Sequence, residues 1–507
     1  MRPIVITSRR AAAISALVAA VLYAPSVRNQ FALDDHAIIR GNPRTHGFGA
    51  ALRAFDKRYW PPEKEAGLWR PLTVLSFGLD WSVGGGSPHW MHATNVVLHA
   101  GATAVVAAFI APYVGAAGAL AGGVLFAVHP LHVEAVANIV GRAEMLAALA
   151  VLGTLLLARI AVRRREAGRS STAAEIGLVG CLIAGLLSKE HAVVTIALLL
   201  LDDVARSPTS RPRLPWRTYA IVALVSVVWF LVRSAIDGGR SFRAMAPAFY
   251  GLDTIGRLST MLPVALTVLR LSFWPMDLSL DYHPQVIARH HTPDPIGLFA
   301  LVVLVALGIL TALCWRRQRV VSVAVLLFVI AWAPTSNVLF PSGIVLSERT
   351  LYLSSVGLAL LAGLAVNSVL STRFRRHALV LGVALALLFA ARSWSRIPLW
   401  YGSREVVLNA LEERPESYMA HMAAGRVYSN MRDYPRALAA FGVAAELYPN
   451  DHLAMTEAGI IAMQAGRLDL AERFLRLAVT ARPSWALPDS LLEEVLRLRA
   501  AASQPSK

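Results

Sequence analysis

Ionisable and polar residues occur in five short blocks beside long apolar runs of this 507-residue sequence. The first block, FALDDHAIIRGNP, places two adjacent carboxylates, Asp34 and Asp35, just after the first apolar run. An ionisable group close to hydrocarbon costs about 2.5 to 3.5 kcal/mol, so such groups are usually paired or line a wet cavity. We therefore expect one shared extracytoplasmic cavity. Besides the aspartates, the blocks supply Arg70, His129, His132, Glu134, Arg142, Glu144, Lys189, Glu190, His191, Glu348 and Arg349.

These residue types suit a reaction with an anionic leaving group delivered from the bilayer. Arg142, Lys189 and Arg349 are the cations expected to hold a phosphate, arginine through a planar fork and lysine as a point charge. A carboxylate is the natural base for an attacking hydroxyl, and Asp34 or Asp35 would be that base. A leaving phosphate needs little protonation, so one carboxylate plus positive charge can suffice for inverting glycosyl transfer.

The spacing of His129, His132 and Glu134 has two interpretations. Residues three apart share a helical face, so this set could hold a divalent metal. Pro130 interrupts that helix, however, and a satisfied polar bend is the stronger interpretation. No cofactor is therefore expected with certainty, and a divalent cation remains the alternative.

The other polar residues also have structural interpretations. An arbitrary pair of aspartates is most often a solvated part of a loop. Lys189 with Glu190 and Glu348 with Arg349 could be ion pairs at helix ends. One helical face is expected to serve hydrogen bonds between helices through His92, Asn95 and His99.

Composition places these blocks in a polytopic membrane protein. Only 16% of the residues are charged, and the mean hydropathy is +0.53, values that soluble globular proteins rarely show. The net charge of +17 comes mostly from arginine clusters between apolar runs. Cytoplasmic loops have this distribution, so nucleic acid is not an expected partner. Cys181 and Cys314 lie in apolar runs and indicate neither a disulfide nor a thiolate metal site.

Eleven apolar runs span, or nearly span, the hydrocarbon core of roughly 30 Å. The first has no small-residue cleavage site after it and is expected to stay as a span. A further run, 255–274, carries Arg257 and Arg270 and is expected to be a re-entrant or surface-lying helix. The N-terminus would then be cytoplasmic with the arginine clusters, opposite the polar blocks. The eleven runs are 11–27, 94–112, 116–131, 143–161, 174–188, 190–203, 217–235, 296–315, 319–339, 350–370 and 378–394.

A repeat of 34 residues follows Trp394, where hydropathy falls and charge rises. This period, with small residues at helix contacts, is typical of tetratricopeptide (TPR) helix pairs. We expect two full repeats, a half repeat in SREVVLNALEER ahead of them, and a short capping helix after Pro488. The repeated positions are Pro415, Pro449 and Pro483; Gly425 and Gly459; Ala437 and Ala471; and Ala444 and Ala478.

Taken together, the five blocks and the repeats resemble the transmembrane and TPR-containing O-mannosyltransferases, which are GT-C membrane glycosyltransferases. The match covers residues 10 to 485 in the same order. The resemblance implies a multi-spanning helical fold with a large first extracytoplasmic loop, a polyprenyl-phosphate mannose donor, and a protein Ser or Thr acceptor. It also implies that Asp34 and Asp35 form the catalytic motif.

Two features depart from the animal members of that family. The TPR array is much shorter, and the arginine-rich chain with only four lysines looks bacterial. The donor lipid would then be undecaprenyl rather than dolichyl, and the location the inner membrane with periplasmic TPR helices that recruit the acceptor polypeptide. Two alternatives remain open: a membrane-anchored TPR scaffold for envelope assembly, and a GT-C enzyme that modifies a glycan or lipid.

The expected organisation is thus all-α, with about eleven spans followed by a TPR α-solenoid. Residues 1–395 would form the membrane glycosyltransferase domain, with 28–93 as its first extracytoplasmic loop. Residues 396–500 would form the repeat domain, and 501–507 a disordered tail.

Overall fold

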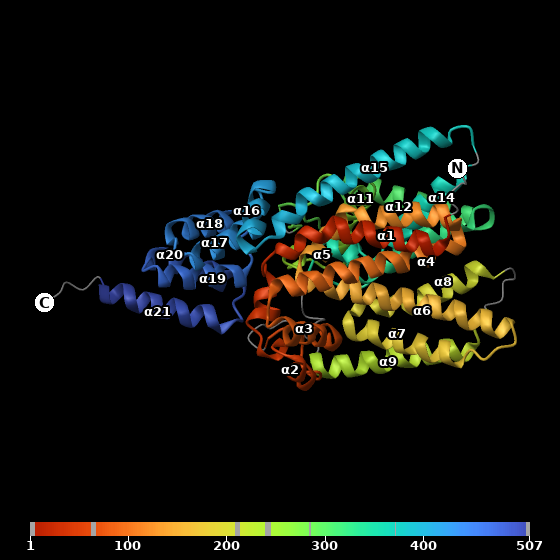
Figure 1. Cartoon of the computed structure of the whole chain (residues 1–507). Helices are drawn as coiled ribbons and strands as arrows, with labels where there is room; N and C mark the ends of the chain where they lie inside the picture. The colour runs from red at the N-terminus through yellow and green to blue at the C-terminus, as the bar shows by residue number, and fades with distance from the viewer. Residues whose placement is uncertain are drawn as a thin grey trace.

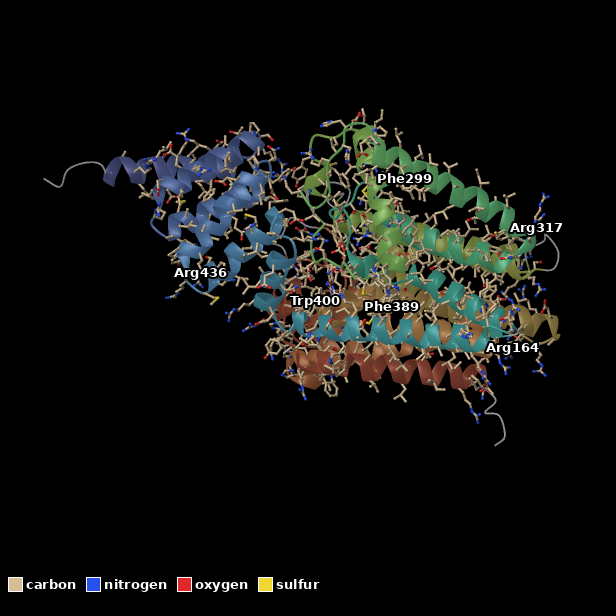
Figure 2. All side chains as sticks on the ribbon, turned by 90° about the horizontal axis from the view of Figure 1, so that it is seen from above. Arg164, Phe299, Arg317, Phe389, Trp400 and Arg436 are labelled. Atoms are coloured by element: carbon tan, nitrogen blue, oxygen red, sulfur yellow. The ribbon has the colours of Figure 1, made fainter. Side chains whose placement is uncertain are left out.

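The structure is a computed structural model that describes residues 6–61, 67–207, 213–238, 245–282, 285–370 and 372–502. A bundle of long helices forms one part, and shorter paired helices pack against one end of it (Figure 1). Helices satisfy their own backbone hydrogen bonds, as an apolar surrounding requires. Apolar side chains such as Phe299 point outward from the bundle, as expected for contact with lipid (Figure 2).

Each of the eleven predicted spans contains a helix. Within the residues that the structure describes, seven segments are long and apolar enough to cross a membrane, those of α1, α4, α6, α9, α11, α12 and α15, and three shorter apolar helices accompany them. The prediction of an all-α polytopic protein is therefore confirmed. The bundle helices are α1 (Ser8–Tyr23), α4 (Pro88–Val128), α6 (Arg142–Glu166), α7 (Thr172–Ser188), α8 (Thr195–Arg206), α9 (Trp216–Asp237), α11 (Thr254–Phe273), α12 (Pro295–Arg317), α13 (Arg319–Trp332), α14 (Ser355–Leu370) and α15 (Arg375–Arg396).

Helix α4 contains two antiparallel helices that meet at Gly115. Gly115 has a φ of 68°, a left-handed conformation that glycine adopts without steric cost. The two halves of α4 lie side by side, because a Cβ atom added to Gly123 would lie 3.0 Å from the Cβ of Ala107. The predicted runs 94–112 and 116–131 are therefore separate passes through the bundle.

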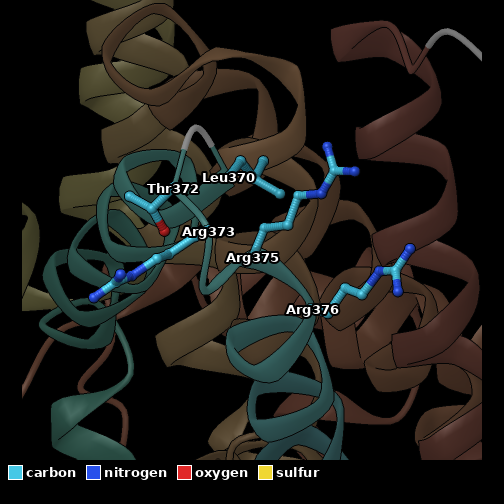
Figure 3. A pocket seen from close by; sticks show the side chains of 5 residues that line it. All are labelled: Leu370, Thr372, Arg373, Arg375 and Arg376. Carbon is cyan, nitrogen blue, oxygen red and sulfur yellow. The ribbon is translucent and has the colours of Figure 1, made fainter.

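Arginine-rich loops gather at one end of the bundle, called the arginine end below. The N-terminus lies at this end (Figure 1), as do Arg164 and Arg317, whereas Trp400 lies toward the opposite end (Figure 2). Here a hollow of about 650 Å³ is lined by Leu370, Thr372, Arg373, Arg375 and Arg376 (Figure 3). The sequence predicts this arrangement, with the arginine clusters together on one side.

The opposite end, called the site end, carries the short elements α2 (Phe48–Arg53), α3 (Pro71–Gly84) and α5 (Val133–Ala137). Helix α11 also lies at this end. Near its start, Arg257 donates to the Asn337 carbonyl just beyond α13, and near its end the Ser272 carbonyl pairs with His129, 3.0 Å away, just beyond α4. Although α11 is long enough to cross, both its ends contact the site end, which agrees with a helix lying across it.

The C-terminal helices form the predicted pairs. A Cβ atom added to Gly425 would lie 2.5 Å from the Phe441 ring, and one added to Gly459 would lie 2.7 Å from Leu475. The same close contact between paired helices therefore recurs in both repeats. The helices are α16 (Ser403–Glu413), α17 (Tyr418–Asn430), α18 (Tyr434–Leu447), α19 (His452–Gln464), α20 (Leu468–Ala481) and α21 (Ala486–Ala502).

Three boundaries in this region differ from the sequence predictions. The capping helix α21 begins before Pro488 and has 17 residues, because proline is tolerated in a first helical turn. The predicted tail at 501–507 overlaps the end of α21 and otherwise lies outside the described residues. The predicted domain boundary at 396 falls inside packed structure, since Trp400 and Val406 share the bundle core.

Candidate active site

A strained turn after α1 gives the two aspartates different surroundings. Leu33 has a φ of 46°, which is uncommon for a residue with a side chain and must be held by its neighbours. One such neighbour is Ser403 at the start of α16, whose Oγ accepts from the Leu33 amide at 2.9 Å. The Gln30 amide also donates to the Tyr401 carbonyl at 2.7 Å. The link between α15 and α16 thus fixes the loop that carries Asp34 and Asp35.

Asp35 is fully buried and ties two loops together. Its Oδ2 accepts from the Ala32 amide and its Oδ1 from the Val140 amide, each at 3.0 Å. Burial raises the pKa of Asp35 to about 7, although these amides oppose the shift. Both carboxylate oxygens have backbone partners, so this geometry suits a positioning role.

Asp34 is the accessible member of the pair. Its side chain is 39% exposed, and its Oδ2 lies 3.9 Å from Nη2 of Arg349. The sequence left open which aspartate would act as the base. Exposure and the neighbouring cation favour Asp34.

Glu134 holds Arg349 in place. Its Oε1 lies 3.4 Å from the Arg349 Nε, and its Oε2 accepts from the Arg349 amide at 2.9 Å. The Ser347 hydroxyl donates to the same carboxylate at 2.8 Å. Burial alone would lower the pKa of Arg349, but Glu134 and Asp34 outweigh it and raise that pKa. Arg349 therefore stays charged beside Asp34.

A second arginine, Arg70, forms a forked ion pair with Glu190. Nε and Nη2 of Arg70 donate to Oε2 of Glu190 at 3.1 and 2.8 Å. This pair connects the start of α3 to the loop between α7 and α8.

Lys189 belongs to the same group of charges. Its ammonium contacts the Glu144 carboxylate, which also lies 3.4 Å from Nδ1 of His191. Burial lowers the pKa of Lys189 to about 8, although Glu144 opposes this shift, and Arg70 and Arg349 are close enough to lower it further. Lys189, Arg70 and Arg349 thus form one cluster with Asp34.

Arg142 does not fit the predicted phosphate-binding role. It is completely buried. Its Nη2 lies 2.5 Å from the Asp80 carboxylate and donates to the Met91 carbonyl at 2.9 Å, and its Nε donates to Asn95 at 2.9 Å. Leaving either charge unpaired here would be costly. Arg142 therefore joins α3, α4 and α6 as a structural cation.

The two histidines form a polar bend. His129 pairs with the Ser272 carbonyl at 3.0 Å, and His132 pairs with the Phe126 carbonyl and the Ser355 hydroxyl, both at 2.8 Å. Glu134 instead faces Ser347 and Arg349, so these residues do not converge as a ligand set. The described part of the chain contains no group of three or more His, Cys, Asp or Glu residues that could hold a metal.

Glu348 points away from the cluster although Arg349 points into it. Its Oε1 accepts from the Ser279 amide at 2.7 Å and from the Tyr282 hydroxyl at 3.1 Å, and its Oε2 lies 3.7 Å from Arg396. Burial raises the pKa of Glu348 to about 7, with Arg396 opposing the shift. The contacts of Glu348 are thus Ser279, Tyr282 and Arg396, whereas Arg349 contacts Glu134 and Asp34.

The predicted hydrogen-bonding face on α4 is present. Asn95 donates to three carbonyl groups between residues 136 and 139, His99 pairs with the Tyr352 hydroxyl at 2.8 Å, and His92 pairs with the Gln30 carbonyl at 3.2 Å. These contacts fix the ends of the helices that frame the cluster.

Tyr59 is a member of the cluster that the sequence did not indicate. The Arg70 guanidinium carbon lies 5.0 Å from the centre of its ring. Burial raises the pKa of its phenol, which the charges of Arg70, Asp34 and Arg349 also influence. Before the fold is known, nothing in the sequence distinguishes Tyr59 from any other tyrosine in a loop.

The arrangement offers an accessible carboxylate beside a fixed arginine, with further cations behind them. A carboxylate so placed can accept a proton from a hydroxyl, and the cations can stabilise negative charge on a departing group. Asp34, Arg349, Arg70, Lys189 and Tyr59 are called the Asp34 cluster below.

Comparison with known proteins gives a consistent set of relatives. No family model matches the chain. The chain is 26% identical to protein O-mannosyl-transferase F38B6.6 of Caenorhabditis elegans over 417 residues, covering 80% of this chain and 58% of that protein. It is 33% identical to protein O-mannosyl-transferase Tmtc2 of Drosophila melanogaster, over 54% of this chain and 30% of that protein.

A human relative is matched over a larger part of this chain. The chain is 26% identical to human protein O-mannosyl-transferase TMTC1, over 89% of this chain and 56% of that protein. The chain spans about half the length of the curated relatives it matches. The resemblance expected from the sequence is confirmed: over most of its length, this chain is similar to the TMTC-type protein O-mannosyl-transferases.

Proposed function

We propose that this protein is a membrane glycosyltransferase that moves mannose from a polyprenyl-phosphate donor to a Ser or Thr hydroxyl of a protein. The observation that carries the proposal is the accessible Asp34 carboxylate, 3.9 Å from Arg349, in a loop bound to Tyr401 and Ser403 at the site end of the bundle. The names of the relatives support the sugar and the protein acceptor.

In the proposed reaction, Asp34 accepts the proton of the acceptor hydroxyl as its oxygen attacks the anomeric carbon. The bond between that carbon and the phosphate oxygen breaks, and the phosphate leaves with the bonding electrons. Arg349 stabilises the charge that develops on the phosphate, together with Arg70 or Lys189. A single displacement inverts the configuration at the anomeric carbon.

Glu134 has a supporting part in this scheme. Glu134 lies 3.4 Å from Arg349, closer than Asp34 at 3.9 Å. We propose that this contact orients Arg349 toward the donor.

The proposed orientation places the arginine end in the cytoplasm and the site end in the periplasm of a bacterial inner membrane. Arginine clusters are retained in the cytoplasm far more often than they are translocated. The donor would then be an undecaprenyl-phosphate sugar, and the C-terminal helices would recruit the acceptor polypeptide beside the Asp34 cluster.

The direct test is a reconstituted transfer reaction. The purified full-length protein would be incubated with radiolabelled undecaprenyl-phosphate mannose and a Ser/Thr-rich peptide, with a peptide of Ala at every Ser and Thr as the matched control. Labelled mannose should appear only on the first peptide, with an inverted anomeric configuration. Transfer to a glycan or lipid acceptor alone would reject the protein acceptor, and a retained configuration would reject the single displacement.

A further inference from the structure

Tyr59 is held rigidly at the edge of the Asp34 cluster. Its amide donates to the Leu68 carbonyl at 2.9 Å, and its side chain is 2% exposed. The ring packs in one apolar group with Ile38, four residues beyond Asp34, and with Ile139, next to the amide that binds Asp35. The ring is therefore fixed by the same loops that place the aspartates.

The Tyr59 hydroxyl is buried without a hydrogen-bond partner among the described residues. Burying an unpaired hydroxyl costs folding free energy, and most buried polar atoms in native proteins have a partner. A plain packing role would be met better by phenylalanine. A tyrosine kept in such a place points to a ligand that completes the hydrogen bond.

The charges around Tyr59 indicate what that ligand is. The Arg70 guanidinium carbon lies 5.0 Å from the centre of the ring, and the positive charges of Arg70 and Arg349 act on the phenol together with the negative charges of Asp34 and Asp35. A neutral O–H close to guanidinium groups can donate to an anion that those cations attract. A phosphate oxygen meets this description, whereas a sugar hydroxyl does not need two cations.

We infer that Tyr59 contacts the donor and that its hydroxyl donates a hydrogen bond to a phosphate oxygen of the polyprenyl-phosphate sugar. This inference rests on the proposed function and adds to it one residue that touches the leaving group. The hydrogen bond is present in the bound donor and strengthens as negative charge grows on the departing phosphate.

The test replaces the hydroxyl and keeps the ring. In the full-length Tyr59→Phe protein, the donor dissociation constant, measured with radiolabelled undecaprenyl-phosphate mannose, should rise by roughly tenfold to a hundredfold, as expected for a hydrogen bond to a charged group. The KM for the peptide acceptor should stay within about twofold. The melting temperature should be unchanged or higher, because the variant loses an unpaired buried hydroxyl.

Tyr428→Phe, the same change in the partly buried ring of α17, is the matched control and should leave donor binding unaltered. Equal donor affinity in the wild type and Tyr59→Phe would overturn the inference, as would a loss of kcat at unchanged donor affinity. If the phenylalanine variant does not fold, Tyr59→Met is measured in the same way. A wild type that binds the donor without transferring sugar would refute the proposed function while leaving this inference decided by the binding constants.

Discussion

Asp34 and Asp35 are adjacent in the loop after α1, but their surroundings differ. Asp34 and Asp35 are indistinguishable by chemistry in the sequence, but one is 39% exposed beside Arg349 and the other is bound by two backbone amides. The turn at Leu33, held by Ser403, fixes the loop that carries both side chains.

The two aspartates are expected to respond differently to the same substitution. In Asp35→Asn, the amide nitrogen cannot accept a hydrogen bond, so one of the two backbone amides loses its partner at a cost of about 1–3 kcal/mol. In Asp34→Asn, no backbone partner is lost and stability should change by less than about 0.5 kcal/mol. Thermal melting of both purified variants measures the difference, and an equal loss in both would refute the assignment of Asp35 as the buried tie.

Glu348 gives the protein a pH dependence of known sign. Its pKa is raised to about 7 in the folded protein by burial, above about 4.3 for an exposed glutamate. Between these two pH values the folded state binds one more proton than the unfolded state. The free energy of unfolding therefore falls as pH rises from about 4 to about 7, by about 4 kcal/mol at most.

The check is the melting temperature of the wild type and of Glu348→Gln between pH 4.5 and 8. The glutamine variant should be less sensitive to pH over this range, since it has no proton to lose at this position. Asp35 has a raised pKa as well, so part of the slope should remain in Glu348→Gln. A steeper slope in the variant would contradict the burial of Glu348 as a protonated acid.

Sequence reasoning identified most of the charged cluster but not the partners of each charge. The structure brings Asp34 to Arg349, Arg70 to Glu190 and Lys189 to Glu144, and the sequence alone did not indicate these pairs. The role of Arg142 was missed because its partner Asp80 lies in a separate helix, and no local pattern connects them. Tyr59 was missed for the same reason.

Elements that are distant in the sequence hold the Asp34 loop. Ser403 begins α16, yet its hydroxyl accepts from the Leu33 amide. The repeat period, the split of α4 at Gly115 and the helical runs follow from periodicity and composition, so the sequence predicts them. The short turns after α1 depend on contacts with the α15–α16 link, which no local pattern encodes.

Removing the Ser403 hydroxyl should disturb catalysis more than stability. In Ser403→Ala the Leu33 amide loses its acceptor, the left-handed turn is less well held, and Asp34 shifts. Small misplacements of a reacting group cost up to about a hundredfold in rate. We expect kcat to fall by roughly tenfold while donor affinity stays within about twofold.

Ser403→Thr keeps the hydroxyl and serves as the control for this experiment. Its kcat should stay close to that of the wild type. A Ser403→Ala enzyme with unaltered kcat would show that the contact with α16 does not position Asp34.

At the scale of the whole molecule, the bundle and the paired helices form one continuous surface at the site end. The Tyr448 hydroxyl donates to the Pro247 carbonyl at 2.8 Å, and Arg414 pairs with Asp277 at 2.9 Å. A small stack of repeats buries little surface by itself, and these contacts add surface against the bundle. No local pattern in the sequence indicates which loops provide them.

Sidedness can be measured by cysteine labelling. Both native cysteines are free and would be replaced by alanine, after which Arg436→Cys on α18 and Arg373→Cys at the arginine end are compared in intact spheroplasts. An impermeant maleimide should label position 436 without lysis and position 373 only after lysis. Labelling of both positions from the same side would contradict the proposed arrangement across the membrane.

The central claim is that Asp34 takes the acceptor proton beside cations that hold the donor phosphate. It is tested most directly by the single-turnover rate of mannose transfer from prebound undecaprenyl-phosphate mannose in wild type and Asp34→Asn, with Asp469→Asn on the exposed face of α20 as the control. We predict that Asp34→Asn lowers this rate by about a hundredfold to ten-thousandfold at unchanged donor affinity. A rate within about twofold of the wild type would contradict the claim, because loss of a general base costs far more than this.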